Sequence, residues 1–195
     1  MYPEDVDPRS GCRLPLPQRD DLDAEGKAVY DRLVDPQGGS LRGLRGPGGI
    51  HLHSPVLSRH SRTLNQYLRS EAALSGRVRE LAILVTARAH DSQFEWAAHE
   101  PEALRQGVPP EVIEAIRHRR STAGLDPADA VVIELGREIF IERKVSPATF
   151  ARALAQFGRR NLVDLVALMG NYAATAALLT AFDMQLDPGQ APGLP

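Results

Sequence analysis

Three side chains that can carry protons, Glu80, Glu95 and His99, lie within one twenty-residue stretch of the chain. A histidine needs little tuning to exchange a proton near neutral pH, because its unperturbed pKa is about 6.5. A carboxylate beside it can orient the imidazole or act as a second proton carrier. The residue types therefore point to a proton-transfer site. In it His99 is the general acid/base, Glu95 its partner and Glu80 the group that orients the imidazole.

Two helices must bring these three side chains together. Residues 81–87 are apolar nearly all round a helix, which predicts a segment that is buried on every side. A second helix is predicted to begin at Ser92. Steps of three and four residues place Ser92, Glu95 and His99 on one face of that helix. If the turn between the helices is tight, they run antiparallel, and Glu80 comes to lie near His99.

The same residues also have a purely structural interpretation. Ser92-x-x-Glu95 matches the capping box, in which the serine oxygen and the glutamate carboxylate satisfy backbone N–H groups at a helix start. His99 would then be an ordinary hydrogen-bonded histidine, and Glu80 would pair with a neighbouring arginine at the surface. The spacing alone leaves both interpretations open.

The order of motifs resembles a known family. R-x-R-E-L-A-I-L spans Glu80, E-W-x-x-H runs from Glu95 to His99, and a Gly and a P-E-x-I-E-A-I helix follow. From about Leu44 to Leu186 the chain resembles the carboxymuconolactone decarboxylase family, which includes the alkylhydroperoxidase D-like proteins. In the redox branch of that family two cysteines form a Cys-x-x-Cys motif, and their positions fall here on Ser92 and Glu95. The resemblance is therefore to the branch that lacks this motif.

This resemblance implies an all-α, alkylhydroperoxidase D-like bundle of about seven or eight helices. A short echo between residues 75–85 and 157–167 hints at an internal repeat. The implied activity is of the decarboxylase, lyase or isomerase type, on a small acidic lactone or enolisable carboxylate, with no cofactor. Two alternatives stay open. One is a peroxidase-like antioxidant activity, which the missing thiols oppose, and the other is a non-catalytic oligomer that binds a small ligand.

Further residues are candidates for lining the site. The family has a similar L-H-S-P helix start, which implies that His53 lines it. The glycine-rich segment 35–49 is expected to be a loop over a pocket, with Arg45 as an anchor for a carboxylate. No metal site is expected, because His51 and His53 lack a third donor nearby. Weaker candidates are Trp96, Ser92, Asn171 and Tyr172.

Helix starts are marked repeatedly by a capping residue followed by proline, and no stretch alternates like a strand. A first helix is predicted from Asp20 to Val34, with Asp20 or Asp21 as its cap. Another is predicted from Pro55 to about Ala73. Residues 1–19 are expected to be an extended arm, 20–186 a single helical domain, and 187–195 a flexible tail.

Composition excludes several classes of function. The 195 residues carry a net charge of −2 with scattered basic residues, so neither nucleic acid nor an anionic membrane is an expected partner. Cys12 is the only cysteine, which excludes an intramolecular disulfide and a two-thiol redox cycle within one chain. The N-terminus lacks the pattern of a signal peptide, so a cytoplasmic location is expected.

The stretch from Asn161 to about Asp183 is nearly uncharged apart from Asp164 and is long enough to cross a membrane. We interpret it instead as a helix that packs inside a soluble protein, because it contains polar and small residues. One chain of this size is too small to cover such an apolar helix on all sides. A homo-oligomer is therefore expected, and the family resemblance implies a trimer or a hexamer.

Overall fold

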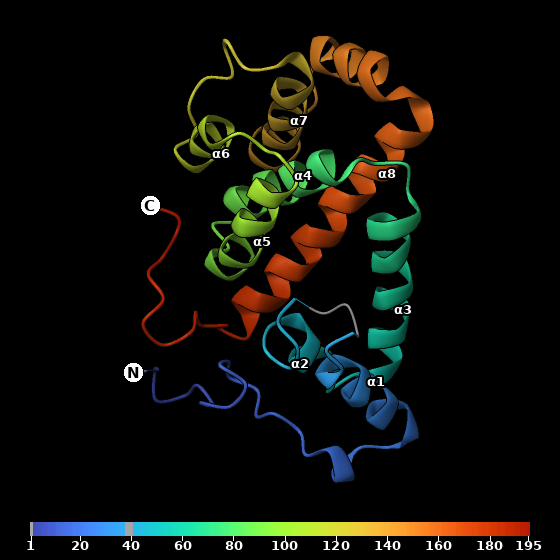
Figure 1. The fold of residues 1–195 in the computed structure, drawn as a ribbon, viewed down its shortest axis with the longest axis vertical. Helices are drawn as coiled ribbons and strands as arrows, with labels where there is room; N and C mark the ends of the chain where they lie inside the picture. The colour runs from blue at the N-terminus through green and yellow to red at the C-terminus, as the bar shows by residue number, and fades with distance from the viewer. Residues whose placement is uncertain (1, 38–40) are drawn as a thin grey trace. The chain divides into compact units, whose positions relative to one another are not determined.

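The computed structural model describes residues 2–37 and 41–195, and within these ranges the regular structure is helical (Figure 1). The only β-type pairing in the described part of the chain is an isolated bridge between Asp7 and Cys12. The expected all-α bundle of seven or eight helices is therefore confirmed. Five of the described helices, α2, α3, α6, α7 and α8, begin with proline, where the missing N–H costs no hydrogen bond.

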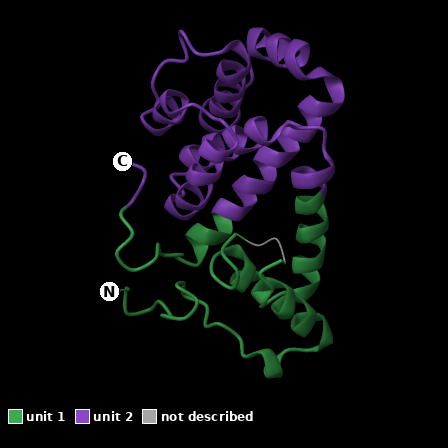
Figure 2. Ribbon diagram, viewed as in Figure 1, with its two compact units in different colours: residues 1–66, 177–191 green, residues 67–176, 192–195 purple. Residues whose placement is uncertain are grey.

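The chain divides into two compact units (Figure 2). One unit comprises Met1–Gln66 and Ala177–Ala191, and the other comprises Tyr67–Ala176 and Pro192–Pro195. The single domain expected over residues 20–186 stays a prediction.

The first unit holds the N-terminal helices. They are η1 Arg19–Asp21, α1 Ala24–Val34, α2 Pro47–His51 and α3 Pro55–Gln66. Asp23, rather than Asp20 or Asp21, caps α1, because its side chain accepts a hydrogen bond from the Gly26 N–H. Residues 2–18 contain no helix. Backbone hydrogen bonds join this arm to residues 182–185: the Arg13 N–H donates to the Phe182 carbonyl at 2.8 Å.

The second unit is built around α4, Gly76–Ala89. This helix packs against α5, α6, α7 and η3, so that every residue from Glu80 to Arg88 is buried. The prediction of a segment buried on every side is confirmed. The other elements of the unit are η2 Tyr67–Glu71, α5 Gln93–Arg105, α6 Pro110–Arg117, α7 Pro127–Arg137, η3 Glu138–Glu142 and most of α8 Pro147–Ala181.

Helix α8 is broken by Gly158, whose φ of 71° lies outside the helical region. Its N-terminal part therefore ends before Gly158, and the apolar part follows. By length and composition α8 could cross a membrane, but a core helix of a soluble protein passes the same test. Leu165, Leu168 and Met169 lie in the core of the second unit, as expected for a packed helix.

The last four residues belong to the second unit. Leu194 is buried, its N–H donates to Gln93 Oε1, and its carbonyl accepts from Gln93 Nε2, both at 3.0 Å. Arg117 also donates to the carbonyl of Gly193. These contacts hold the end of the chain against α5, while flexibility over residues 187–195 stays a prediction.

Candidate active site

Helices α4 and α5 are joined by a tight turn. Asp91 adopts a left-handed conformation with φ of 49°, and the Ser92 N–H donates to the Ala87 carbonyl at 2.8 Å. This pattern ends α4 and lets α5 begin within three residues. Helix α5 folds back along α4, so a residue early in α4 meets one in the middle of α5.

Glu80 and His99 are the residues that meet. His99 Nδ1 lies 2.7 Å from Glu80 Oε2, and the exposed fractions of the two residues are 5% and 0%. An ionised carboxylate only accepts hydrogen bonds, so Nδ1–H is the donor, and in the neutral imidazole this leaves the lone pair on Nε2. The geometry places Glu80 where it orients the imidazole, and the expected proximity of the two residues is observed. Glu80 does lie beside a neighbouring arginine, Arg79, as the structural interpretation expects, but the pair is not at the surface, because the carboxylate is fully buried.

Two guanidinium groups offset the charge of Glu80. Its Oε1 lies 3.6 Å from Arg79 Nε and 3.9 Å from Arg69 Nη2, without a direct hydrogen bond among the described residues. Arg79 is held in place by donating to the Arg69 carbonyl at 2.6 Å. The buried carboxylate is thus surrounded by positive charge on one side and the imidazole on the other.

Glu95 has no such partners. It is 4% exposed, and its Oε2 makes no hydrogen bond within the described ranges. Burial raises the pKa of Glu95 to about 8, because the ionised form loses its hydration and no charged or hydrogen-bonding group replaces it. Ser92 is the N-cap of α5, but its side chain accepts no capping hydrogen bond. The capping-box interpretation of Ser92 and Glu95 is therefore wrong.

Tyr172 of α8 completes the cluster. Its ring meets that of His99 edge to face, with centroids 5.2 Å apart and planes at 87°. Its hydroxyl accepts a hydrogen bond from Arg69 Nη1 at 3.1 Å. Burial raises the pKa of Tyr172, Arg69 opposes this rise, and Glu80 and Glu95 add to it when they are ionised. The phenol is therefore neutral and lies within the electrostatic reach of both carboxylates.

A buried Glu–His pair on two helices, with a second glutamate four residues before the histidine, is the arrangement that the family resemblance implies. Residues 55–135 match the model of the carboxymuconolactone decarboxylase family. The resemblance found in the sequence is thereby confirmed, and it supports a general carboxymuconolactone decarboxylase-like or alkylhydroperoxidase D-like function. No curated protein matches the chain significantly.

The carboxymuconolactone decarboxylase match covers Glu80, Glu95 and His99, whereas Tyr172 lies beyond it. Arg69 lies inside the match, and no pattern in the sequence singled it out. It belongs to η2, a π-helical turn that follows α3, and such turns are frequent at functional sites.

The remaining candidates of the second unit have structural contacts. Trp96 is fully buried, and its Nε1–H donates to Glu100 Oε2 at 2.9 Å. The guanidinium of Arg117 lies 5.0 Å from the centre of the Trp96 ring. Asn171 precedes Tyr172 on α8, and its carbonyl accepts from the Thr175 hydroxyl at 3.0 Å.

His53 and Arg45 lie in the first unit, where both have partners. His53 Nε2 is 2.9 Å from the Pro15 carbonyl oxygen. Arg45 Nε is 3.2 Å from Asp187 Oδ1, and its Nη1 donates to the Tyr2 hydroxyl at 2.9 Å. Part of the glycine-rich segment, residues 38–40, lies outside the described residues. Across the described chain, no group of three or more His, Cys, Asp or Glu side chains could hold a metal ion.

Proposed function

We propose that the protein is a non-redox proton-transfer enzyme that acts on a small acidic lactone or an enolisable carboxylate. The observation that carries this proposal is a histidine hydrogen-bonded to a buried glutamate, with a second buried glutamate four residues earlier on the same helix. That second glutamate, Glu95, acts electrostatically on Tyr172, whose ring contacts His99. A buried carboxyl group whose pKa is raised can act as a general acid near neutral pH.

The two groups take different roles at neutral pH. With a pKa of about 8, Glu95 is protonated in roughly nine of ten molecules at pH 7 and can donate a proton. His99, with Nδ1–H bonded to Glu80, can accept one at Nε2. His99 removes the proton next to the substrate carbonyl, the C–H electron pair moves into the enolate, and Glu95 protonates the developing oxyanion. The negative charge of Glu80 stabilises the imidazolium that forms.

An acidic substrate also needs a cation. Arg69 is partly exposed and already donates to Tyr172, which holds its guanidinium beside the Glu80–His99 pair. A guanidinium can bind a carboxylate through two parallel hydrogen bonds and so fix its orientation. Arg69 is therefore the residue that we assign to the substrate carboxylate.

The antioxidant alternative needs an attacking and a resolving thiol. The corresponding positions are Ser92 and Glu95. Cys12 lies in the other unit, buried, with its thiol 3.5 Å from the Leu14 carbonyl. We expect no peroxide turnover with a thiol reductant. Robust turnover that persists in Cys12→Ser would contradict the proposed chemistry.

Substitution at Glu95 and His99 tests the proposal. Small lactone acids and enolisable carboxylates are screened for carbon dioxide release or loss of ultraviolet absorbance. Glu95→Gln and His99→Gln should each lower the rate by roughly a hundredfold or more. The double variant should lose much less than the product of the single losses, because the two residues act as one unit. Glu111→Gln is the matched control, since Glu111 is an exposed glutamate of the same unit. Full activity in both single variants would remove the catalytic interpretation and favour a non-catalytic binding protein.

We further propose that the protein is a homo-oligomer, a trimer or a hexamer. This proposal is supported by an apolar face of α8 that is exposed in the described chain. Val163 is 68% exposed, Val166 is also exposed, and the small residues Gly170 and Ala174 continue the same face. An apolar strip of this kind suits close helix packing against a second copy. Light scattering should give at least three subunits, with a smaller mass for Val163→Arg. A stable monomer in the unsubstituted protein would contradict it.

A further inference from the structure

The guanidinium of Arg69 lies close to the buried carboxylate of Glu80 but does not bond with it. Arg69 Nη2 is 3.9 Å from Glu80 Oε1, and that oxygen has no hydrogen bond among the described residues. Hydrogen-bonded pairs of opposite charge are about 2.7–2.9 Å apart, so the two groups stop about 1 Å short of contact. Opposite charges attract strongly where little water screens them, so another contact must hold the guanidinium back.

The hydroxyl of Tyr172 provides that contact. It accepts a hydrogen bond from Arg69 Nη1 at 3.1 Å, so one nitrogen of the guanidinium is bonded while Nη2 faces Glu80. Tyr172 is 5% exposed and belongs to the core of the second unit, so packing fixes its position. The backbone of Arg69 is held separately, because its carbonyl accepts a hydrogen bond from Arg79 Nη1 at 2.6 Å. The Arg69 side chain nevertheless stays 24% exposed, so a ligand in solution can reach it.

The ring of the same tyrosine contacts the candidate base. The ring centres of Tyr172 and His99 are 5.2 Å apart with the planes at 87°, the edge-to-face arrangement that aromatic pairs prefer. His99 in turn is bonded through Nδ1 to Glu80 Oε2 at 2.7 Å. One side chain therefore contacts both the imidazole and the guanidinium, and it keeps the guanidinium away from the carboxylate that orients the imidazole.

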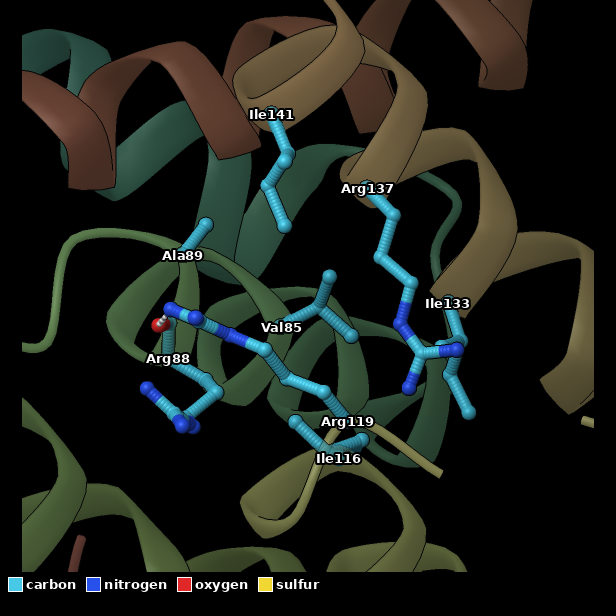
Figure 3. Close-up of a pocket in the computed structure, with 8 residues that line it drawn as sticks. All are labelled: Val85, Arg88, Ala89, Ile116, Arg119, Ile133, Arg137 and Ile141. Atoms are coloured by element: carbon cyan, nitrogen blue, oxygen red, sulfur yellow. Dashed lines mark hydrogen bonds between the residues drawn. The ribbon is translucent and has the colours of Figure 1, made fainter. Parts of the chain in front are cut away.

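The arginines at the other end of α4 have different contacts. Arg88, Arg119 and Arg137 line a cavity of about 10 Å³ (Figure 3), which has room for about one water molecule. Arg88 and Arg137 donate to backbone carbonyls near the end of α6, at 2.7 and 3.1 Å, and so serve as helix caps. The Arg69 side chain instead donates to a side-chain hydroxyl beside the candidate base, which indicates a role in the site.

We propose that Tyr172 is a positioning residue of this site. Its hydroxyl holds the Arg69 guanidinium off Glu80 and leaves it open to the carboxylate of an acidic substrate. Glu80 thereby keeps its charge for His99, and Arg69 keeps donors for the substrate. Tyr172 acts through Arg69, so its role rests on the proposed function, in which Arg69 binds the substrate carboxylate. Tyr172 then determines how strongly the site prefers an acid to a neutral analogue of the same shape.

The test compares a small lactone acid with its neutral ester. γ-Butyrolactone-γ-carboxylate and its methyl ester are titrated into the full-length protein, and binding is followed by the NMR signals of backbone amides. The acid should bind more tightly than the ester, because only the acid carries a charge for Arg69. Tyr172→Phe keeps the ring beside His99 and removes the hydroxyl. It should weaken binding of the acid at least about tenfold and binding of the ester less than about twofold.

Two further variants separate positioning from a purely structural role. In Arg69→Gln the added change Tyr172→Phe should alter the affinity for the acid less than about twofold, because Tyr172 acts through Arg69. Tyr67→Phe is the matched control, since it removes a hydroxyl bonded to Asp164 of α8 at 3.1 Å and should leave both affinities unchanged. A second measurement needs no ligand. The side-chain NMR signals of Arg69 should shift in Tyr172→Phe, as the guanidinium moves onto Glu80, and should not shift in Tyr67→Phe.

Unchanged affinity for the acid in Tyr172→Phe would overturn the proposal while leaving the proposed function intact. An equal loss for acid and ester would also overturn it, because the hydroxyl would then only support packing. If neither ligand binds the unsubstituted protein, the proposed substrate class is wrong instead. The Arg69 signals then decide the role of Tyr172, which unchanged signals in Tyr172→Phe would refute. If Tyr172→Phe does not fold, the nuclear Overhauser effect between the Arg69 side chain and the Tyr172 ring in the unsubstituted protein decides, and its absence would overturn the proposal.

Discussion

Glu80 of α4 and Glu95 of α5 are buried to nearly the same extent, yet their surroundings are opposite. Glu80 accepts a hydrogen bond from His99 and has two arginines within 4 Å. Glu95 has no hydrogen bond at Oε2 in the described chain, and its pKa rises to about 8. Burial alone therefore does not determine the protonation state of a carboxyl group. Its partners decide whether it serves as a permanent charge or as a proton carrier.

Truncation of Glu80 should have the largest effect on stability. Glu80→Ala removes the hydrogen-bond partner of buried His99 and the carboxylate beside the partly exposed Arg69 and Arg79. Removing one partner of a buried charged pair costs about 3–5 kcal/mol. Urea unfolding at pH 7 measures the loss. Glu111→Ala, at an exposed position, should stay within about 0.5 kcal/mol of the unsubstituted protein. If Glu80→Ala lowers the free energy of unfolding by less than about 1 kcal/mol, the partners of Glu80 do not stabilise the fold, and Glu80 does not differ from Glu95 in this respect.

Glu95→Gln should stabilise the protein, and the gain should depend on pH. The pKa of Glu95 is raised from 4.5 to about 8 in the folded state, so the unfolded chain releases the proton first. The contribution of Glu95 to the free energy of unfolding is fully present below pH 4.5. As the pH rises from 4.5 to about 8, this contribution falls by about 1.4 kcal/mol per pH unit. The glutamine side chain of the variant does not titrate, so its advantage should grow across that window to a few kcal/mol and then level off.

Denaturant melts at several pH values check this prediction. The comparison is the difference in unfolding free energy between the variant and the unsubstituted protein, which cancels the titration of all other groups. A difference that does not change with pH would show that Glu95 ionises in the folded state as easily as in the unfolded chain. The contrast between the two glutamates would then be one of packing only.

Much of the fold was predictable because helix starts are local signals. Proline begins α3, α6, α7 and α8, as the sequence indicates. The apolar run 81–87 is enough to predict the buried helix, and the spacing across one turn is enough to bring Glu80 to His99. The ends of helices were less predictable. An α-helix is expected from Pro55 to Ala73, but α3 ends at Gln66 and the π-helical turn η2 follows it.

The site was only partly predictable, since its remaining features depend on contacts between distant segments. Tyr172 lies 73 residues after His99, and no spacing rule joins them. Arg69 lies in the π-helical turn η2 and contacts Tyr172, which is 103 residues further along the chain. The isolation of Glu95 could not be predicted at all. The sequence motif indicates a capping box, and whether its hydrogen bonds form is decided by the packing around α5.

The smallest expected effect is the difference between the two serines that begin α4 and α5. Ser75 at the start of α4 accepts a hydrogen bond from the Val78 N–H at 3.2 Å, whereas Ser92 at the start of α5 makes no such bond. Ser75→Ala should therefore cost about 1 kcal/mol, and Ser92→Ala should stay within about 0.5 kcal/mol. Thermal melts of both variants in one buffer measure the difference. Equal losses would mean that Ser92 caps α5 in solution. Glu95 would then be the capping-box partner of Ser92, and it would not be an unpaired carboxyl group that can carry a proton.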